Sequence, residues 1–123
     1  MKTPKLFLFM KCKKMTKRVF CFDIDNTLCG PVSVQGDYSK VEPIKEMISF
    51  VNELYHEGHT IYLYTGRHTM QALVTNKWLE EHQVKYHHLY LGKPVADVYI
   101  DDLAIRYRGL DDTKNQLNEL GLL

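Results

Sequence analysis

The sequence predicts an α/β fold in which a parallel β-sheet is flanked by helices. Short segments rich in β-branched and aromatic residues alternate with longer segments whose apolar residues recur at helical spacing. The expected order is strand, helix, strand, helix, strand, strand, helix, which is typical of parallel βαβ units with right-handed crossovers. A chain of 123 residues, of which 45% are hydrophobic and 25% are charged, fits one domain with a buried core.

The first half of the chain predicts two strands separated by a helix. Residues 18–24 form an apolar and aromatic run that indicates a buried strand. Residues 28–42 contain two glycines and a proline, so we expect a loop there. Pro43 suits the first turn of a helix that should end at Gly58. The run TIYLYT at residues 60–65 indicates the second strand.

The second half predicts a helix, two more strands and a final helix. Thr69 is placed to cap the second helix, and Trp78 lies on the apolar face of that helix. A weaker third strand is expected at residues 86–91, and a fourth is expected at residues 96–101. An aspartate and a glycine bracket the last helix at residues 111–121.

Charge and cysteine content bear on the environment of the protein. The formal net charge is +1 without a basic stripe, so nucleic acid is a partner that the composition does not favour. The odd set of Cys12, Cys21 and Cys29 lacks metal-type spacing and argues against a disulfide framework, so we expect reduced thiols and a cytoplasmic location. We expect residues 1–14 to form a disordered basic tail before one domain at residues 15–123. The apolar run in that tail is too short for a signal-peptide core or a membrane span, and no membrane partner is expected.

Polar residues follow each of the four expected strands. The carboxyl ends of parallel strands share one edge of a sheet, where open α/β folds bind ligands. We therefore expect these sequence-distant clusters to meet in one crevice. The clusters contain Asp23, Asp25 and Asn26, then Thr65, Gly66 and Arg67, then Lys93, and finally Asp101 and Asp102.

The charges of these clusters predict a cation. Four aspartates in one crevice would repel one another unless a positive charge compensates them. An all-oxygen set of ligands suits Mg²⁺, which takes one or two carboxylates and keeps several waters. Lys93 adds a further positive charge, while the Thr65 hydroxyl and the amides of Gly66 and Arg67 offer donors to an anion. Such a combination is typical of phosphoryl transfer.

The motifs DIDNT, TGR, GKP and IDD occur in the order and approximate spacing of the haloacid-dehalogenase (HAD) superfamily. The chain resembles this superfamily over residues 18–106, and more weakly resembles its small phosphatases of capsular or surface polysaccharide biosynthesis. The resemblance implies a three-layer, Rossmann-like (HAD-like) sheet. Because only residues 28–42 separate the first motif from its helix, it also implies that no cap domain is present. An open site would suit a large substrate, or a homo-oligomer whose subunits cover it.

The resemblance also implies roles for individual residues. Asp23 matches the nucleophile that forms an aspartyl-phosphate, and Asp25 matches the general acid and base. Thr65 matches the phosphate-binding hydroxyl, and Lys93 matches the lysine that steadies the nucleophile. Other residues expected at the phosphate are Gly66, Arg67 and Asn26, although Arg67 is equally compatible with pairing to an acidic residue. The implied Mg²⁺ ligands are Asp23, the Asp25 carbonyl and Asp102, with Asp101 acting through water.

The leading interpretation is a magnesium-dependent phosphomonoester hydrolase, with a sugar phosphate or a surface-glycan precursor as its substrate. A polynucleotide 3′-phosphatase or a protein phosphatase is the alternative within the same class. A receiver-like phosphoacceptor module shares the acidic cluster, threonine and lysine, but receivers carry the acidic pair at the first strand. Here the pair comes last. A catalytically silent interaction protein would be expected to lack a motif residue, and all are present.

Overall fold

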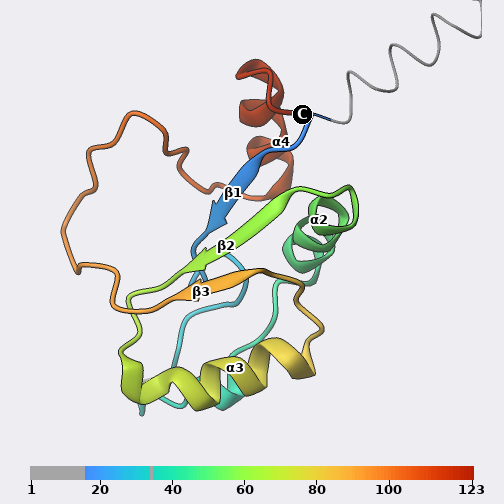
Figure 1. Ribbon diagram of the computed structural model, residues 1–123. Helices are drawn as coiled ribbons and strands as arrows, with labels where there is room; N and C mark the ends of the chain where they lie inside the picture. The colour runs from blue at the N-terminus through green and yellow to red at the C-terminus, as the bar shows by residue number, and fades with distance from the viewer. Residues whose placement is uncertain (1–15, 34) are drawn as a thin grey trace, which may run out of the picture.

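The computed structural model describes residues 16–33 and 35–123 (Figure 1). Over these residues the sheet contains three parallel strands in the order β1-β2-β3. The strands are β1 (Val19–Phe22), β2 (Thr60–Tyr64) and β3 (His88–Tyr90). Residues 19–22 pair with residues 60–63, and residues 62–64 pair with residues 88–90. The predicted α/β class and the first three predicted strands are confirmed.

Three α-helices accompany the sheet in the described part of the chain. They are α2 (Lys45–His56), α3 (Ala72–Glu81) and α4 (Leu110–Glu119), and they correspond to the three predicted helices. Two short 3₁₀ turns, η1 (Tyr38–Lys40) and η2 (Thr69–Gln71), precede α2 and α3 respectively. None of the described helices is both long and apolar enough to cross a membrane.

The start of α3 differs from the prediction. Thr69 was expected to cap this helix, but it lies inside the 3₁₀ turn that leads into it. His68 occupies the capping position instead, and its backbone N–H donates to the Gln71 side chain at 3.1 Å. The prediction is wrong because a 3₁₀ turn precedes the helix, and regular α-helical bonding begins only at Ala72.

One face of the sheet packs against α2. Phe22 meets Phe50 of α2 edge to face, with ring centroids 6.2 Å apart. Ile61 and Leu63 alternate with half-exposed residues along β2 and are fully buried, as the period of two in a strand requires. Trp78 of α3 is also buried, and this confirms its predicted place in the core. Its indole N–H donates to the Val41 carbonyl at 2.9 Å, so the polar atom is satisfied.

The opposite face of the sheet is open. Val19 is 61% exposed, Tyr90 is 47% exposed, and Cys21 is exposed as well. Parallel sheets usually have helices over both faces. The described residues therefore establish a parallel sheet with helices around it, and they do not establish the complete three-layer arrangement that was expected.

The fourth predicted strand, at residues 96–101, is wrong for this structure. Residues 91–109 form no regular element, and the middle of this segment lies apart from the sheet as a wide orange loop (Figure 1). Local bonds organise parts of it, because Tyr99 Oη donates to the Pro94 carbonyl and Asp101 Oδ1 accepts from Leu103 N–H. A composition suited to a strand does not choose a partner, and pairing is a tertiary event. The tail expected at residues 1–14 lies outside the described residues.

Leu63→Ala should reduce the free energy of unfolding by about 2–5 kcal/mol, because Leu63 is fully buried in the central strand and the change leaves a cavity. Urea denaturation measures the difference. Leu73→Ala, the same change at an 86% exposed position of α3, is the control and should alter stability by no more than about 0.5 kcal/mol. Equal losses in the two variants would contradict the packing described for β2.

Candidate functional site

The turn after β1 is built around one backbone carbonyl. The Ile24 carbonyl accepts hydrogen bonds from the backbone N–H groups of residues 27–29 at 2.8–3.2 Å. The Ile24 side chain is fully buried. Asn26 adopts a left-handed backbone conformation with φ of +63°, which asparagine tolerates better than most residues. The turn therefore holds Asp23 and Asp25, its half-buried carboxylates, close to the carboxyl end of β1.

The end of β2 is fastened to the turn after β3. Thr65 N–H donates to the Tyr90 carbonyl at 2.9 Å, and the Lys93 N–H donates to the Thr65 carbonyl at 2.8 Å. The Gly92 N–H donates to the Arg67 carbonyl at 2.9 Å. Gly92 has φ of +76°, a region in which other residues are strained, so glycine suits this turn. These bonds bring Lys93 to the same edge as the turn after β1.

Asp23 lies beside a cation at this edge. The distance from Asp23 Oδ2 to Lys93 Nζ is 4.0 Å, while Oδ1 accepts from the Ile24 N–H at 2.9 Å. Burial raises the pKa of Asp23 above its ordinary value, and the charge of Lys93 and the Ile24 hydrogen bond partly oppose this. The Lys93 ammonium also lies 4.6 Å from the ring centroid of Tyr99. Asp23 is thus a partly desolvated carboxylate whose main positive neighbour is Lys93, with a smaller influence from Arg67.

Asp25 has a different partner. Its Oδ1 accepts from Arg67 Nη2 at 2.8 Å, and its Oδ2 accepts from Arg67 Nε at 3.1 Å. The Arg67 side chain has no solvent exposure. The arginine therefore pairs with an acidic residue, which was one of its two expected roles, and in this arrangement it presents no group to a phosphate.

Thr65 and Gly66 differ in their access to solvent. Thr65 is fully buried, and its Oγ1 accepts from the Arg67 backbone N–H at 3.2 Å. Gly66 is exposed, and a Cβ there would stand 3.6 Å from the Lys93 carbonyl oxygen. Of these two expected phosphate-binding residues, only Gly66 is accessible from solvent.

The expected acidic pair lies apart from this group. Asp101 and Asp102 are exposed on the segment after β3, and Asp101 caps the Leu103 N–H instead of facing a cation. Across residues 16–33 and 35–123, no three His, Cys, Asp or Glu side chains are close enough to hold a metal ion. The structure thus brings together Asp23, Asp25, Thr65, Arg67 and Lys93, and it does not bring the pair to them.

Two contacts of Arg67 were missed by sequence reasoning. Tyr38 of η1 places its ring over the guanidinium, with 4.0 Å from Arg67 Cζ to the ring centroid. Thr75 of α3 accepts from Arg67 Nη1 at 3.0 Å. Thr75 precedes Trp78 by three residues and so shares its buried helical face. A polar residue on that face was the signal that the sequence offered, whereas nothing local marked Tyr38.

Cys29 contributes a thiol to the same cluster. Its Sγ lies 3.6 Å from Asp25 Oδ1 and 3.9 Å from Arg67 Nη2. Burial and the charge of Asp25 raise the pKa of the Cys29 thiol to about 12. Cys29 therefore remains a neutral, buried hydrogen-bonding group near neutral pH, and not a nucleophile.

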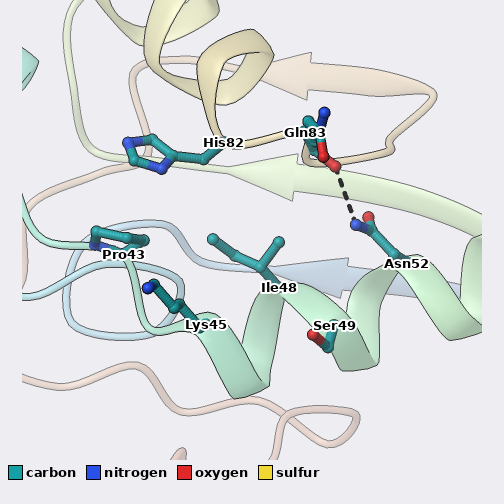
Figure 2. A pocket seen from close by; sticks show the side chains of 7 residues that line it. All are labelled: Pro43, Lys45, Ile48, Ser49, Asn52, His82 and Gln83. Atoms are coloured by element: carbon teal, nitrogen blue, oxygen red, sulfur yellow. Dashed lines mark hydrogen bonds between the residues drawn. The ribbon is translucent and has the colours of Figure 1, made fainter.

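A separate groove of about 320 Å³ lies between α2 and the end of α3 (Figure 2). Across it, the Asn52 side-chain amide donates to the Gln83 carbonyl at 2.9 Å. The Asn52 side-chain oxygen also accepts from the Lys85 N–H at 2.8 Å. These bonds fasten α2 to the turn before β3. None of the residues expected at the functional site lines this groove. The groove is therefore separate from the polar cluster at the carboxyl edge of the sheet.

Comparisons with known proteins support the fold. No protein-family model and no curated protein matches the chain. Among solved structures, it is similar to a structural-genomics target from Vibrio cholerae, with 25% identity and a TM-score of 0.65. That match covers 85% of this chain and 99% of the other. The match therefore spans nearly the whole of a solved chain. This α/β arrangement thus recurs in another protein.

Two further matches come from structures of the Pnkp1/Rnl/Hen1 complex, one of them described as an RNA repair complex. Their identities are 18% and 17%, with TM-scores of 0.56 and 0.55. They cover 69% and 84% of this chain, but only 30% and 32% of the other chains. The chain therefore has the fold of one part of those larger proteins.

Asp23→Asn should increase the free energy of unfolding near pH 7. Because burial raises the pKa of Asp23 in the folded protein, its contribution to stability is lost as pH rises through that pKa. The gain in the variant should shrink as the pH falls toward about 3, where the unfolded carboxyl is also largely protonated. Urea denaturation of the variant and of wild type at several pH values between these limits measures the difference in stability. Asp97→Asn, at an exposed position, is the control. A variant less stable than wild type near pH 7 would contradict the described environment of Asp23.

Proposed function

We propose that this protein is a phosphomonoester hydrolase of the HAD superfamily that works through an aspartyl-phosphate on Asp23. The observation that supports this most directly is the 4.0 Å separation of Asp23 Oδ2 and Lys93 Nζ at the carboxyl edge of the sheet. A carboxylate that is half-buried and beside a lysine suits a nucleophile toward a phosphate, because the lysine offsets negative charge on the approaching group. Asp25 stands two residues away for proton transfer.

In the first step, an Asp23 carboxylate oxygen attacks phosphorus, and the bond from phosphorus to the ester oxygen breaks. Asp25, which has taken up a proton from solvent on one oxygen while it stays bound to Arg67, gives this proton to the departing oxygen. In the second step, water attacks the phosphorus of the aspartyl-phosphate while the Asp25 carboxylate takes the water's proton. The bond between phosphorus and the Asp23 oxygen then breaks, and phosphate leaves. Lys93 offsets negative charge on the phosphoryl oxygens in both steps.

We also propose that the activity depends on Mg²⁺, with Asp23, the Asp25 carbonyl and Asp102 as its ligands and with Asp101 acting through water. As they stand, these residues do not fit one cation, since no group of three acidic, histidine or cysteine side chains gathers within the described residues. The proposal therefore includes a second position for residues 95–103. Bound Mg²⁺ would compensate the carboxylates that otherwise repel one another.

The free side of β1 is the position that we propose for this segment. In the described sheet β1 is an edge strand, and an edge strand can accept another strand by backbone pairing. Val95, Ile100 and Leu103 are each at least 88% exposed, and burying such a side chain contributes about 1.5–3 kcal/mol. A strand parallel to β1 would end at the edge that carries Asp23.

For the substrate, we propose a sugar phosphate or a surface-glycan precursor, following the narrower resemblance in the sequence. A polynucleotide 3′-phosphate is the second candidate, and the shared fold with chains of an RNA repair complex supports including it in the same screen. A phosphoprotein is a third. The absence of any inserted cap in the described residues favours a large substrate, or a second copy of the chain that covers the site.

Wild-type protein with Mg²⁺ should hydrolyse p-nitrophenyl phosphate, and Asp23→Asn should lower the rate by more than about 10³-fold because the nucleophile is lost. Asp111→Asn removes an exposed carboxylate of α4 and should keep the wild-type rate. Accumulation of a stable aspartyl-phosphate without turnover would instead favour the receiver-like module. Turnover that persists in Asp23→Asn would rule out the proposed nucleophile.

Asp102→Asn should raise the Mg²⁺ concentration needed for half-maximal rate by at least about tenfold, whereas exposed Asp97→Asn should not. EDTA should abolish turnover by wild type. Hydrogen exchange provides a readout without substrate, because a strand formed by residues 96–101 would protect its amides when Mg²⁺ is added. Unchanged exchange in this segment at saturating Mg²⁺ would exclude the second position of the segment.

A further inference from the structure

Arg67 is a buried arginine that has an acceptor or a contact on every side. Its Nε and Nη2 donate in parallel to the two oxygens of Asp25, at 3.1 and 2.8 Å. Its Nη1 donates to Thr75 Oγ1 at 3.0 Å, and Tyr38 stacks on its plane at 4.0 Å. The side chain has no solvent exposure. A planar guanidinium held at its edges and its face has one available orientation, so it can fix the orientation of the carboxylate that it binds.

The contacts of the two Asp25 oxygens are unequal. Oδ1 has the shorter bond from Arg67 and also lies 3.6 Å from Cys29 Sγ. Oδ2 has the longer bond from Arg67 Nε, and no second protein donor to it is found among the described residues. A carboxylate offers about two lone pairs on each oxygen. Oδ2 therefore keeps a lone pair that can hold a proton while both bonds to Arg67 remain.

We propose that Arg67 is a positioning residue that orients Asp25 so that Oδ2 is the oxygen that carries the transferred proton. This inference rests on the proposed hydrolase function. In the first step the proton passes from Oδ2 to the ester oxygen as the phosphorus–oxygen bond breaks. In the second step Oδ2 receives a proton from the attacking water. Arg67 itself touches neither the substrate nor the phosphoryl group, and it acts only through Asp25.

Two residues outside the strands contact Arg67 and help to hold it in place. Tyr38 belongs to η1, within the loop at residues 28–42, and Thr75 belongs to α3. The loop is fastened at its base, where Gly30 N–H donates to the Glu42 carbonyl at 2.8 Å. Through Tyr38, η1 covers one face of the guanidinium, so any contribution of η1 to the reaction runs through Arg67.

The experiment compares phosphomonoesters with good and poor leaving groups in Arg67→Lys, Thr75→Val and Tyr38→Ala. Loss of proton transfer matters most when the leaving group is poor, so each variant should lower kcat/KM for an alkyl phosphate by about tenfold or more. The loss for p-nitrophenyl phosphate should be much smaller. Thr113→Val alters another buried threonine, in α4, and is the matched control with a wild-type dependence on leaving group.

A double-mutant cycle separates positioning from general destabilisation. In an Asp25→Asn background the three changes should cause no further loss for the alkyl phosphate, because their effect runs through the Asp25 proton. Losses that are equal for both leaving groups, or that persist in this background, would overturn the proposal. Arg67→Lys keeps the charge but not the paired donors, and Thr75→Val leaves Arg67 in place should the lysine variant fail to fold.

The ¹H–¹⁵N spectrum tests the same contact without substrate. The Arg67 Nε–H, assigned by its loss in Arg67→Lys, should be protected from exchange with water and should shift in Asp25→Asn. A rapidly exchanging Nε–H would overturn the proposed positioning by itself. A protected Nε–H in a wild-type protein that hydrolyses no phosphomonoester would overturn the proposed function, and the inference that rests on it, while leaving the ion pair established.

Discussion

An ion pair between the buried guanidinium of Arg67 and the half-buried carboxylate of Asp25 joins the turn after β1 to the turn after β2, and the arrangement of the carboxyl edge depends on it. Asp25 and Arg67 are 42 residues apart, and the parallel pairing of the two strands brings them together. Leaving a buried charge without its partner costs about 3–5 kcal/mol, so the guanidinium requires the acceptors that surround it. Asp25 and Thr75 supply these acceptors, and one interaction thereby stabilises the fold and organises the site.

The two aspartates of the first motif have contrasting environments although one residue separates them. Asp25 accepts two hydrogen bonds from a buried arginine, whereas Asp23 has a lysine at 4.0 Å and a hydrogen bond from the Ile24 N–H. Burial without full compensation raises the pKa of Asp23, so its ionised form is held at some cost to the folded state. Such a separation of environments is how two like groups come to serve different chemical roles.

The open side of the sheet and the segment after β3 both expose groups that contact between them would cover. β1 has an unpaired edge in the described sheet, and the face that carries Val19 and Cys21 is exposed. Residues 95–103 present apolar side chains to solvent, which is unusual for a segment without a partner. Both surfaces would lose exposed apolar area on contact, and this gives a physical reason for the second position included in the proposed function.

The sequence by itself determined the alternation of strands and helices, the core position of Trp78 and the grouping of polar residues after each strand. These features follow from local periodicity and from the shared edge of parallel strands, and the structure bears out the first three strands. Only the tertiary structure decided that Arg67 binds Asp25, that Tyr38 covers it, and that residues 96–101 stand away from β1. The physical reason is that pairing partners and the burial of a polar side chain depend on groups distant in the chain, whereas periodicity reports only on neighbours.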